Sequence, residues 1–180
     1  FISIKSLSTL SFGLDSITKK HAKIRLISGH RFSTSDLNML KKIYQNGYGH
    51  KFNGNMIRDS KISHLQKVIK DFKLEIKIAI PNSELVDGSF EERLGIFRDE
   101  NDDVVAFTGT SNVTFDAQNR NFESIDVFTS WDDKIRTDAK IENFEKLWNN
   151  ETHYVEVYDL IFAEKNNLLK YTTEWAVDKY

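Results

Sequence analysis

Apolar residues along this chain follow two different periods, and the alternation of these periods predicts a succession of strands and amphipathic helices. Short runs rich in β-branched residues, such as LEIKIAI at 74–80, are typical of strands. Segments whose apolar residues lie three or four positions apart are typical of helices that bury one face. The predicted strands cover residues 1–5, 22–28, 74–80, 92–97, 104–108, 124–129 and 154–158. The predicted helices cover 7–20, 36–45, 61–72, a segment from Asp132 or Asp133 to Trp148, and 162–177.

This order of elements favours an α/β fold, a mixed and mostly parallel sheet flanked by helices. The strands at 92–97 and 104–108 are close in sequence and are joined by the turn-forming residues 99–103, so they predict a hairpin. A length of 180 residues fits one domain that covers 1–180. Because the chain opens on a strand-like segment at Phe1, we expect it to be part of a longer polypeptide.

Composition narrows the possible chemistry. The chain has no Cys, which excludes thiolate zinc sites, disulfides and cysteine nucleophiles and fits a cytoplasmic protein. Its five His residues show no metal-ligand spacing, so neither a metal nor another cofactor is predicted. With a mean hydropathy of −0.48 and no apolar run of roughly 18 residues, a membrane span is not expected either.

Charge is balanced overall but unevenly distributed. The net charge is −2, yet residues 41–73 hold eight Lys or Arg against two acids, whereas residues 84–103 hold eight acids against two Arg. Such a basic segment can steer nucleic acid, and Lys51, Lys61 and Lys67 are the candidate phosphate-binding residues. Lys51 also lies among Tyr44, Tyr48 and Phe52, rings that can stack on bases or simply pack together. A solvated helix face opposite a polar loop is the alternative interpretation of the uneven charge distribution.

The residues that suggest chemistry occur in three short motifs. They are Glu91-Glu92-Arg93 at the start of a predicted strand, Gly109-Thr110-Ser111-Asn112 after the hairpin, and Asn121-Phe122-Glu123. Residues at i and i+2 of a strand share a face, so Glu91 and Arg93 are expected to point the same way, with Gly95 leaving room beside them. A guanidinium, a hydroxyl and an amide are all donors suited to a phosphodiester.

These motifs resemble the active-site signature of phospholipase D-like phosphodiesterases, which have a His-x-Lys strand, a Gly-Ser-x-Asn turn and an Asn-x-Glu. Nearly the whole chain is similar to the phospholipase D-like domain that precedes superfamily 2 DEAD/DEAH helicase domains in restriction and defence proteins. The stretches that carry this similarity are 23–29, 74–81, 95–110 and 121–131. The chain lacks the phosphate-loop motif of a helicase motor itself.

The resemblance implies a role for each matching position. Glu91 falls where the family has its nucleophilic His, and Arg93 falls where it has Lys. Arg93, Thr110 and Asn112 would bind phosphoryl oxygens, and Glu123 would orient the nucleophile. Because the family builds its site from two copies of the motif, a chain with one copy is expected to form a homodimer. DNA and a helicase domain in the same polypeptide are the other implied partners.

The residue at position 91 decides how this resemblance is interpreted. A carboxylate repels a phosphodiester and replaces an imidazole poorly. The first hypothesis is therefore a degenerate site, with Arg93 paired to Glu91 or Glu123, in a domain that binds nucleic acid or dimerises. The second is a working metal-independent nuclease in which His30 or another chain supplies the nucleophile. The third is a pure protein-docking module.

Overall fold

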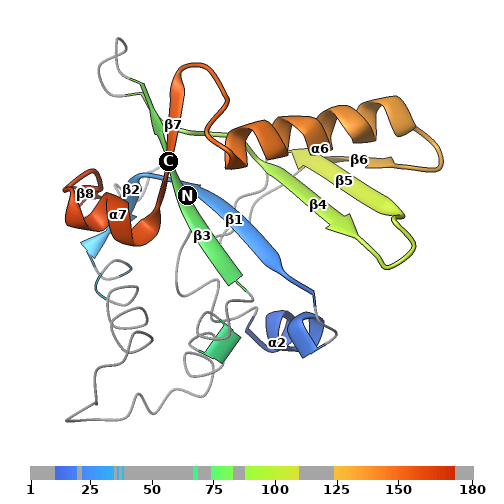
Figure 1. Cartoon of the computed structure of the whole chain (residues 1–180), viewed down its shortest axis with the longest axis horizontal. Helices are drawn as coiled ribbons and strands as arrows, with labels where there is room; N and C mark the ends of the chain where they lie inside the picture. Colours follow the sequence, from blue (N-terminus) through green and yellow to red (C-terminus); the bar gives the residue numbers. More distant parts are fainter. Residues whose placement is uncertain are drawn as a thin grey trace.

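The computed structural model describes residues 11–19, 22–34, 36, 38, 67–68, 74–82, 88–109 and 124–172. These residues form small sheets and helices of a mixed α/β architecture (Figure 1). A mixed sheet is present, as predicted. The expectation that pairing is mostly parallel is wrong for the described strands, because two strand pairs are parallel and three are antiparallel.

The central sheet has the order β1-β3-β7, and its middle strand has buried residues on both faces. Strand β1 (Ile24–Gly29) runs parallel to β3 (Leu74–Pro81), and β3 runs antiparallel to β7 (Val155–Asp159). Ile78 on one face and Ala79 on the other are both 0% exposed. Ile78 packs with Leu160 and Ala163 of helix α7 (Leu160–Lys165), whereas Ala79 packs with Leu147. Because successive side chains point to opposite faces of the sheet, β3 contributes residues to two separate core clusters.

A second sheet is an antiparallel meander in the order β4-β5-β6. Strands β4 (Leu94–Arg98) and β5 (Val104–Gly109) form the predicted hairpin, and β6 (Ile125–Thr129) pairs with β5. The Asp99 carboxylate closes the hairpin turn by accepting the N–H groups of Asn101 and Asp103, both at 2.9 Å. An Asp side chain that bonds to the backbone two residues ahead is a frequent turn-forming device.

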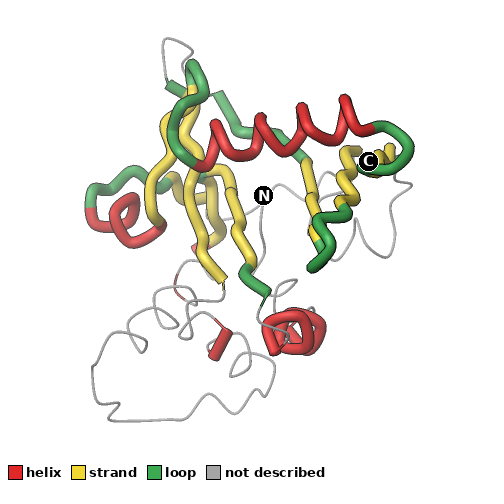
Figure 2. The backbone as a smooth tube through the Cα atoms, turned by 45° about the vertical axis from the view of Figure 1, so that its right-hand side comes forward, coloured by secondary structure: helices red, strands yellow, loops and turns green. Residues whose placement is uncertain are grey.

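Helix α6 (Lys134–Trp148) contacts both sheets (Figure 2). It begins where predicted, because the Asp133 carboxylate accepts the N–H of Arg136 at 3.2 Å and caps the first turn. Thr137, near its start, is 0% exposed, and the Arg136 guanidinium lies 5.0 Å from the Phe128 ring of β6. Its last turn packs Leu147 against the central sheet.

The helix predicted for 162–177 is present only over 162–165, and the prediction is wrong for the described residues 166–172. Helix α7 ends at Lys165, and the chain turns through Asn167, whose φ is 56°, into β8 (Lys170–Thr172). Asparagine tolerates this left-handed conformation better than most residues, so it ends the helix where the apolar stripe alone would continue it. Strand β8 pairs parallel with β2 (Arg31–Ser33), and neither strand was predicted.

The remaining predictions are tested only in part. Helix α2 (Ser11–Lys19) lies inside the helix predicted for 7–20. Residues 34, 36, 38, 67 and 68 are helical, in or beside the helices predicted for 36–45 and 61–72, and the rest of those helices lies outside the described residues. The strand predicted for 1–5 lies there too. Among the described helices, none combines the length and the apolar character needed to cross a bilayer.

Candidate functional site

The structure describes only part of the predicted site. Glu91, Arg93 and Lys67 lie in described segments. The other candidates lie outside the described residues, namely Thr110, Asn112, Glu123, Lys51 and Lys61. That the three motifs meet at one mouth therefore stays a prediction.

Glu91 and Arg93 form an ion pair with each other. The Nη2 atom of Arg93 donates to Oε2 of Glu91 at 3.3 Å, and the Ser89 hydroxyl donates to Oε1 at 2.8 Å. Both carboxylate oxygens of Glu91 are thus engaged. The side chains are 65% exposed for Glu91 and 33% exposed for Arg93, so the pair lies at the surface. Of the two ion pairs that the sequence suggests for Arg93, the one with Glu91 is present.

The local backbone differs slightly from the prediction. Strand β4 begins at Leu94, so Glu91 and Arg93 belong to the irregular segment at 88–93 that leads into it. Gly95 does not leave space beside Arg93. A Cβ atom at Gly95 would lie 2.0 Å from Cζ of Phe107, its cross-strand neighbour. The absent side chain therefore makes room for the Phe107 ring, which also stacks on Phe97 with centroids 5.7 Å apart.

Lys67 lies apart from this pair. It is exposed on a helical turn whose next residue, Val68, is 1% exposed. Val68 belongs to the core cluster that contains Leu74, the first residue of β3. The Glu91 segment instead lines a groove together with Pro81, the last residue of β3. Nothing in the described part of the chain brings Lys67 to the Glu91–Arg93 pair.

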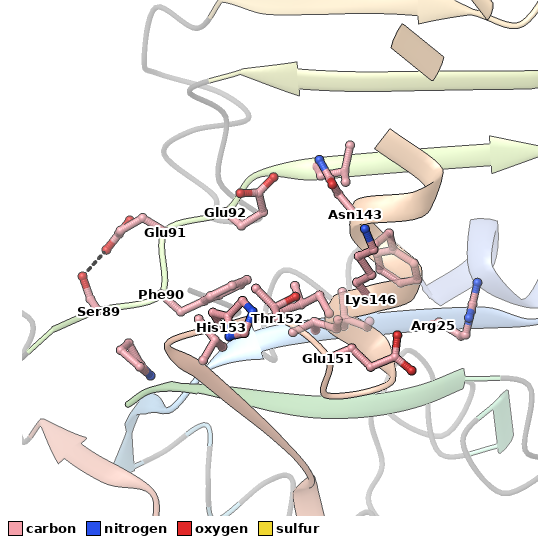
Figure 3. Close-up of a pocket in the computed structure, with 17 residues that line it drawn as sticks. Arg25, Ser89, Phe90, Glu91, Glu92, Asn143, Lys146, Glu151, Thr152 and His153 are labelled. Atoms are coloured by element: carbon pink, nitrogen blue, oxygen red, sulfur yellow. Dashed lines mark hydrogen bonds between the residues drawn. The ribbon is translucent and has the colours of Figure 1, made fainter. Parts of the chain in front are cut away.

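The groove beside Glu91 has a volume of about 1000 Å³ (Figure 3). It is walled by the segment before β4, by the last turns of α6 and by the loop that leads into β7. Apolar side chains line much of it, and polar side chains surround them. The polar and charged residues are Arg25, Ser89, Glu91, Glu92, Asn143, Lys146, Glu151, Thr152 and His153. Figure 3 shows Glu91 turned toward Ser89.

The two cations of the groove are each paired with a carboxylate on α6. Arg25 donates two hydrogen bonds to Glu145, and Lys146 lies 2.6 Å from Glu142. The hydrogen bond to Glu142 is also the main cause of the raised pKa of Lys146. Neither cation is therefore an unneutralised phosphate-binding group.

His30, the alternative nucleophile, is buried rather than placed at the groove. Its side chain is 3% exposed, and its Nδ1 atom has no hydrogen-bond partner within the described structure. Burial, together with the nearby charges of Lys170 and Arg31, lowers the pKa of His30. It is absent from the groove lining that the described residues form. A buried neutral imidazole does not support the role of an accessible nucleophile.

One further observation limits the chemistry of the site. Within the described segments, no group of three or more His, Asp or Glu side chains is arranged to hold a metal ion.

The groove residues Glu92, Asn143, Glu151 and His153 were not predicted as site residues. They come from segments that are far apart in the sequence and share no motif, so no local signal identifies them.

Comparison of the chain with protein-family models, with curated proteins and with solved structures finds no match.

Proposed function

We propose that this chain is a non-hydrolytic domain of phospholipase D-like fold that binds DNA as a homodimer, within a cytoplasmic DNA-processing protein that also carries a helicase domain. The proposal combines the resemblance of the three motifs with one structural observation. That observation is the ion pair between Glu91, at the position of the family's nucleophile, and Arg93, at the position of its phosphate-binding Lys.

The pair supports the loss of hydrolysis for two reasons. A carboxylate at the attacking position repels the anionic substrate, and its two oxygens already accept hydrogen bonds from Arg93 and Ser89. The Arg93 guanidinium meanwhile donates a hydrogen bond to Glu91, and this donor is not available to a phosphoryl oxygen. A phosphate that entered would have to displace this pair, which weakens both binding and orientation at this point.

The outer face of the β4-β5-β6 sheet supports dimer formation. Register places Phe97, Val127 and Ile125 on one face, and these side chains are 60%, 59% and 50% exposed. The opposite face is covered by α6 and holds Val104 and Ala106, which are 3% and 0% exposed. An exposed apolar sheet face of this kind is a frequent interaction surface.

A second copy is the partner that this face suits best. An apolar patch is self-complementary, as a twofold interface requires. Phe97 lies on β4, the strand that directly follows the segment with Glu91 and Arg93, so the patch is close in sequence to the residues that the resemblance puts at the dimer axis. If DNA binding fails in the test below while the dimer persists, this face favours the pure docking module as the second candidate function.

Hydrolysis is tested with a chromogenic bis-aryl phosphodiester in the presence of a chelator. We expect no turnover by the native chain and measurable turnover by the double variant Glu91→His with Arg93→Lys, because that variant restores the nucleophile and its neighbour. A folded double variant that stays inert would contradict a merely degenerate site. Turnover by the native chain would overturn the proposal in favour of the working nuclease.

DNA binding is tested by fluorescence anisotropy with a labelled duplex over a range of salt concentrations. We expect affinity to fall as salt rises and to drop about tenfold in the double reversal Lys61→Glu with Lys67→Glu. Lys23→Glu with Lys165→Glu, at two exposed positions outside the basic segment, is the matched control for charge. Light scattering tests the dimer: Val127→Lys should give a monomer, whereas Ile135→Lys, at an 87% exposed position on α6, should not.

A further inference from the structure

The groove beside the 88–94 segment has an apolar floor. Leu147 of α6 lines it and belongs to a core cluster, and Ile27 of β1, Phe90 and Val155 of β7 line it and pack against that cluster. A volume of about 1000 Å³ lies at the upper end of the range for pockets that bind one small organic molecule. Size and lining therefore suit a ligand with an apolar body.

The cations at this groove are already neutralised by the protein. Arg25 is held by Glu145 through two hydrogen bonds, of 2.8 and 2.5 Å, and Lys146 is held by Glu142 at 2.6 Å. Each pair joins a groove residue to a carboxylate that is not itself part of the groove lining. An anionic ligand would have to compete with these short contacts.

Of the three acidic side chains that the described groove lining contains, only Glu91 has both carboxylate oxygens engaged. Glu92 and Glu151 are exposed, and neither carboxylate makes a hydrogen bond or a close ion pair with any other residue that the structure describes. Glu151 contributes only a longer-range attraction to Lys146. The two carboxylates come from different walls, Glu92 from the segment before β4 and Glu151 from the loop after α6 (Figure 3).

We infer that this groove binds a small organic cation, an amine with an aromatic or aliphatic body. The body would lie on the floor formed by Ile27, Leu147 and Val155, where burial of apolar surface favours it. The ammonium group would lie near Glu92 or Glu151, the two groove carboxylates that have no close cationic partner among the described residues. These carboxylates disfavour phosphate, so the inference does not depend on the proposed nucleic-acid function, although Glu91 of the Glu91–Arg93 pair also lines the groove.

Three isosteric probes separate charge from shape. Phenylbutylamine, phenylbutanol and phenylbutyrate share the apolar body and differ in charge, and the amine is protonated at neutral pH. Each is titrated into the nitrogen-15-labelled full chain, and amide shift changes are followed by NMR. We expect the amine to bind about two- to fivefold more tightly than the alcohol, and the alcohol more tightly than the carboxylate. The shifts should concentrate at residues 25–27, 90–94, 143–147 and 151–155.

Variants test whether the rim carboxylates are responsible. Glu92→Gln with Glu151→Gln should lower the affinity for phenylbutylamine to that for phenylbutanol and leave the alcohol unaffected. Glu100→Gln with Asp103→Asn removes two exposed carboxylates in the β4–β5 turn and should change neither affinity. This control pair matches the test pair in the number of charges removed.

Several outcomes would overturn the inference. They are equal binding of amine and alcohol, absence of binding by all three probes, and shifts that map outside the groove. Tighter binding of an acetylated Phe-Lys amide than of phenylbutylamine would also overturn it, because the groove would then be a peptide site. A negative result in the phosphodiester or DNA assay would not change the outcome of these NMR titrations, so each proposal can fail without the other.

Discussion

Arg25 on β1 and Glu145 on α6 form a two-pronged ion pair 120 residues apart in the sequence, with Nη1 to Oε2 at 2.8 Å and Nη2 to Oε1 at 2.5 Å. The Arg25 guanidinium also lies over the rings of Phe144 and Trp148, at 4.9 and 5.3 Å from their centroids. Lys77 of β3 adds a hydrogen bond to the Trp148 carbonyl at 3.0 Å. Two strands of the central sheet thus hold the end of the helix that covers the second sheet, and they fix one wall of the groove.

Replacing Glu145 by Gln should lower the free energy of unfolding at pH 7 by about 1 kcal/mol. A two-pronged Arg–carboxylate pair is among the stronger contacts, but the side chains are 36% and 43% exposed, so solvent screening reduces its value. Urea unfolding measures the change. Lys134→Gln, which breaks the exposed pair with Asp138 within α6, is the control and should cost less than half as much.

The contribution of Glu145 should also depend on pH. The hydrogen bond from Arg25 is the main cause that lowers the pKa of Glu145 below its usual 4.5. Because the unfolded chain then binds the proton more readily, the stabilisation is present above pH 4.5 and is lost as pH falls through the lower pKa of the folded state. Unfolding curves of the native chain and of Glu145→Gln should converge in acid, and a constant gap down to pH 2 would contradict this assignment.

Asp133 should anchor the start of α6. Asp133→Ala removes the acceptor for the Arg136 N–H and should cost about 1 kcal/mol of stability, whereas Asp133→Asn should cost much less because Asn also caps helices well. Thermal unfolding followed by circular dichroism gives both values. Asp132→Ala is the matched control, since Asp132 only accepts a hydrogen bond from the exposed Thr129 hydroxyl. Equal losses at 132 and 133 would show that the cap residue is misassigned.

Much of the fold follows from local patterns that the sequence displays. The strand at 74–80 and the helix that ends at Trp148 were predicted because period and capping residues agree there. The three-residue strands β2 and β8 were not, because Arg31 pairs with Lys170 only through tertiary contact, and three residues carry no period. The overlong helix from 162 has the opposite cause: its apolar stripe continues past the residue at which Asn167 turns the chain.

The candidate site was likewise predicted only in part. Spacing of two residues predicted that Glu91 and Arg93 share a side, and they do pair. The groove could not be predicted, since Glu92 and Glu151 approach it from segments separated by the whole second sheet and α6. Local spacing reports neighbours on one strand, whereas a groove between walls depends on how strands and helices pack.

Two glycines should respond to Ala in opposite directions. Gly95→Ala places a methyl group 2.0 Å from Cζ of Phe107, so the ring must leave its position over β4 and its stacking on Phe97. We expect a loss of about 1 kcal/mol. Gly13 in α2 has no atom within 4 Å of a built Cβ, so Gly13→Ala should stabilise the chain by up to about 1 kcal/mol through helix propensity. Chemical unfolding of both variants tests this, and destabilisation by both would contradict the described surroundings of Gly13.

His30 should make the fold less stable as pH falls below neutrality. Burial is the main cause that lowers its pKa from the usual 6.5, and the positive charges of Lys170 and Arg31 lower it further. Well above pH 6.5 the imidazole is neutral in both the folded and the unfolded chain, so this group does not change the free energy of unfolding. Below it the unfolded chain binds the proton first, and stability falls until the pH reaches the lower pKa of the folded state, with a slope of at most about 1.4 kcal/mol per pH unit. The decisive measurement is urea unfolding from pH 7.5 to pH 5 on the native chain, on His30→Gln and on the exposed-site control His153→Gln. The slope should diminish in His30→Gln alone, and an unchanged slope there would show that His30 is protonated without penalty in the folded protein.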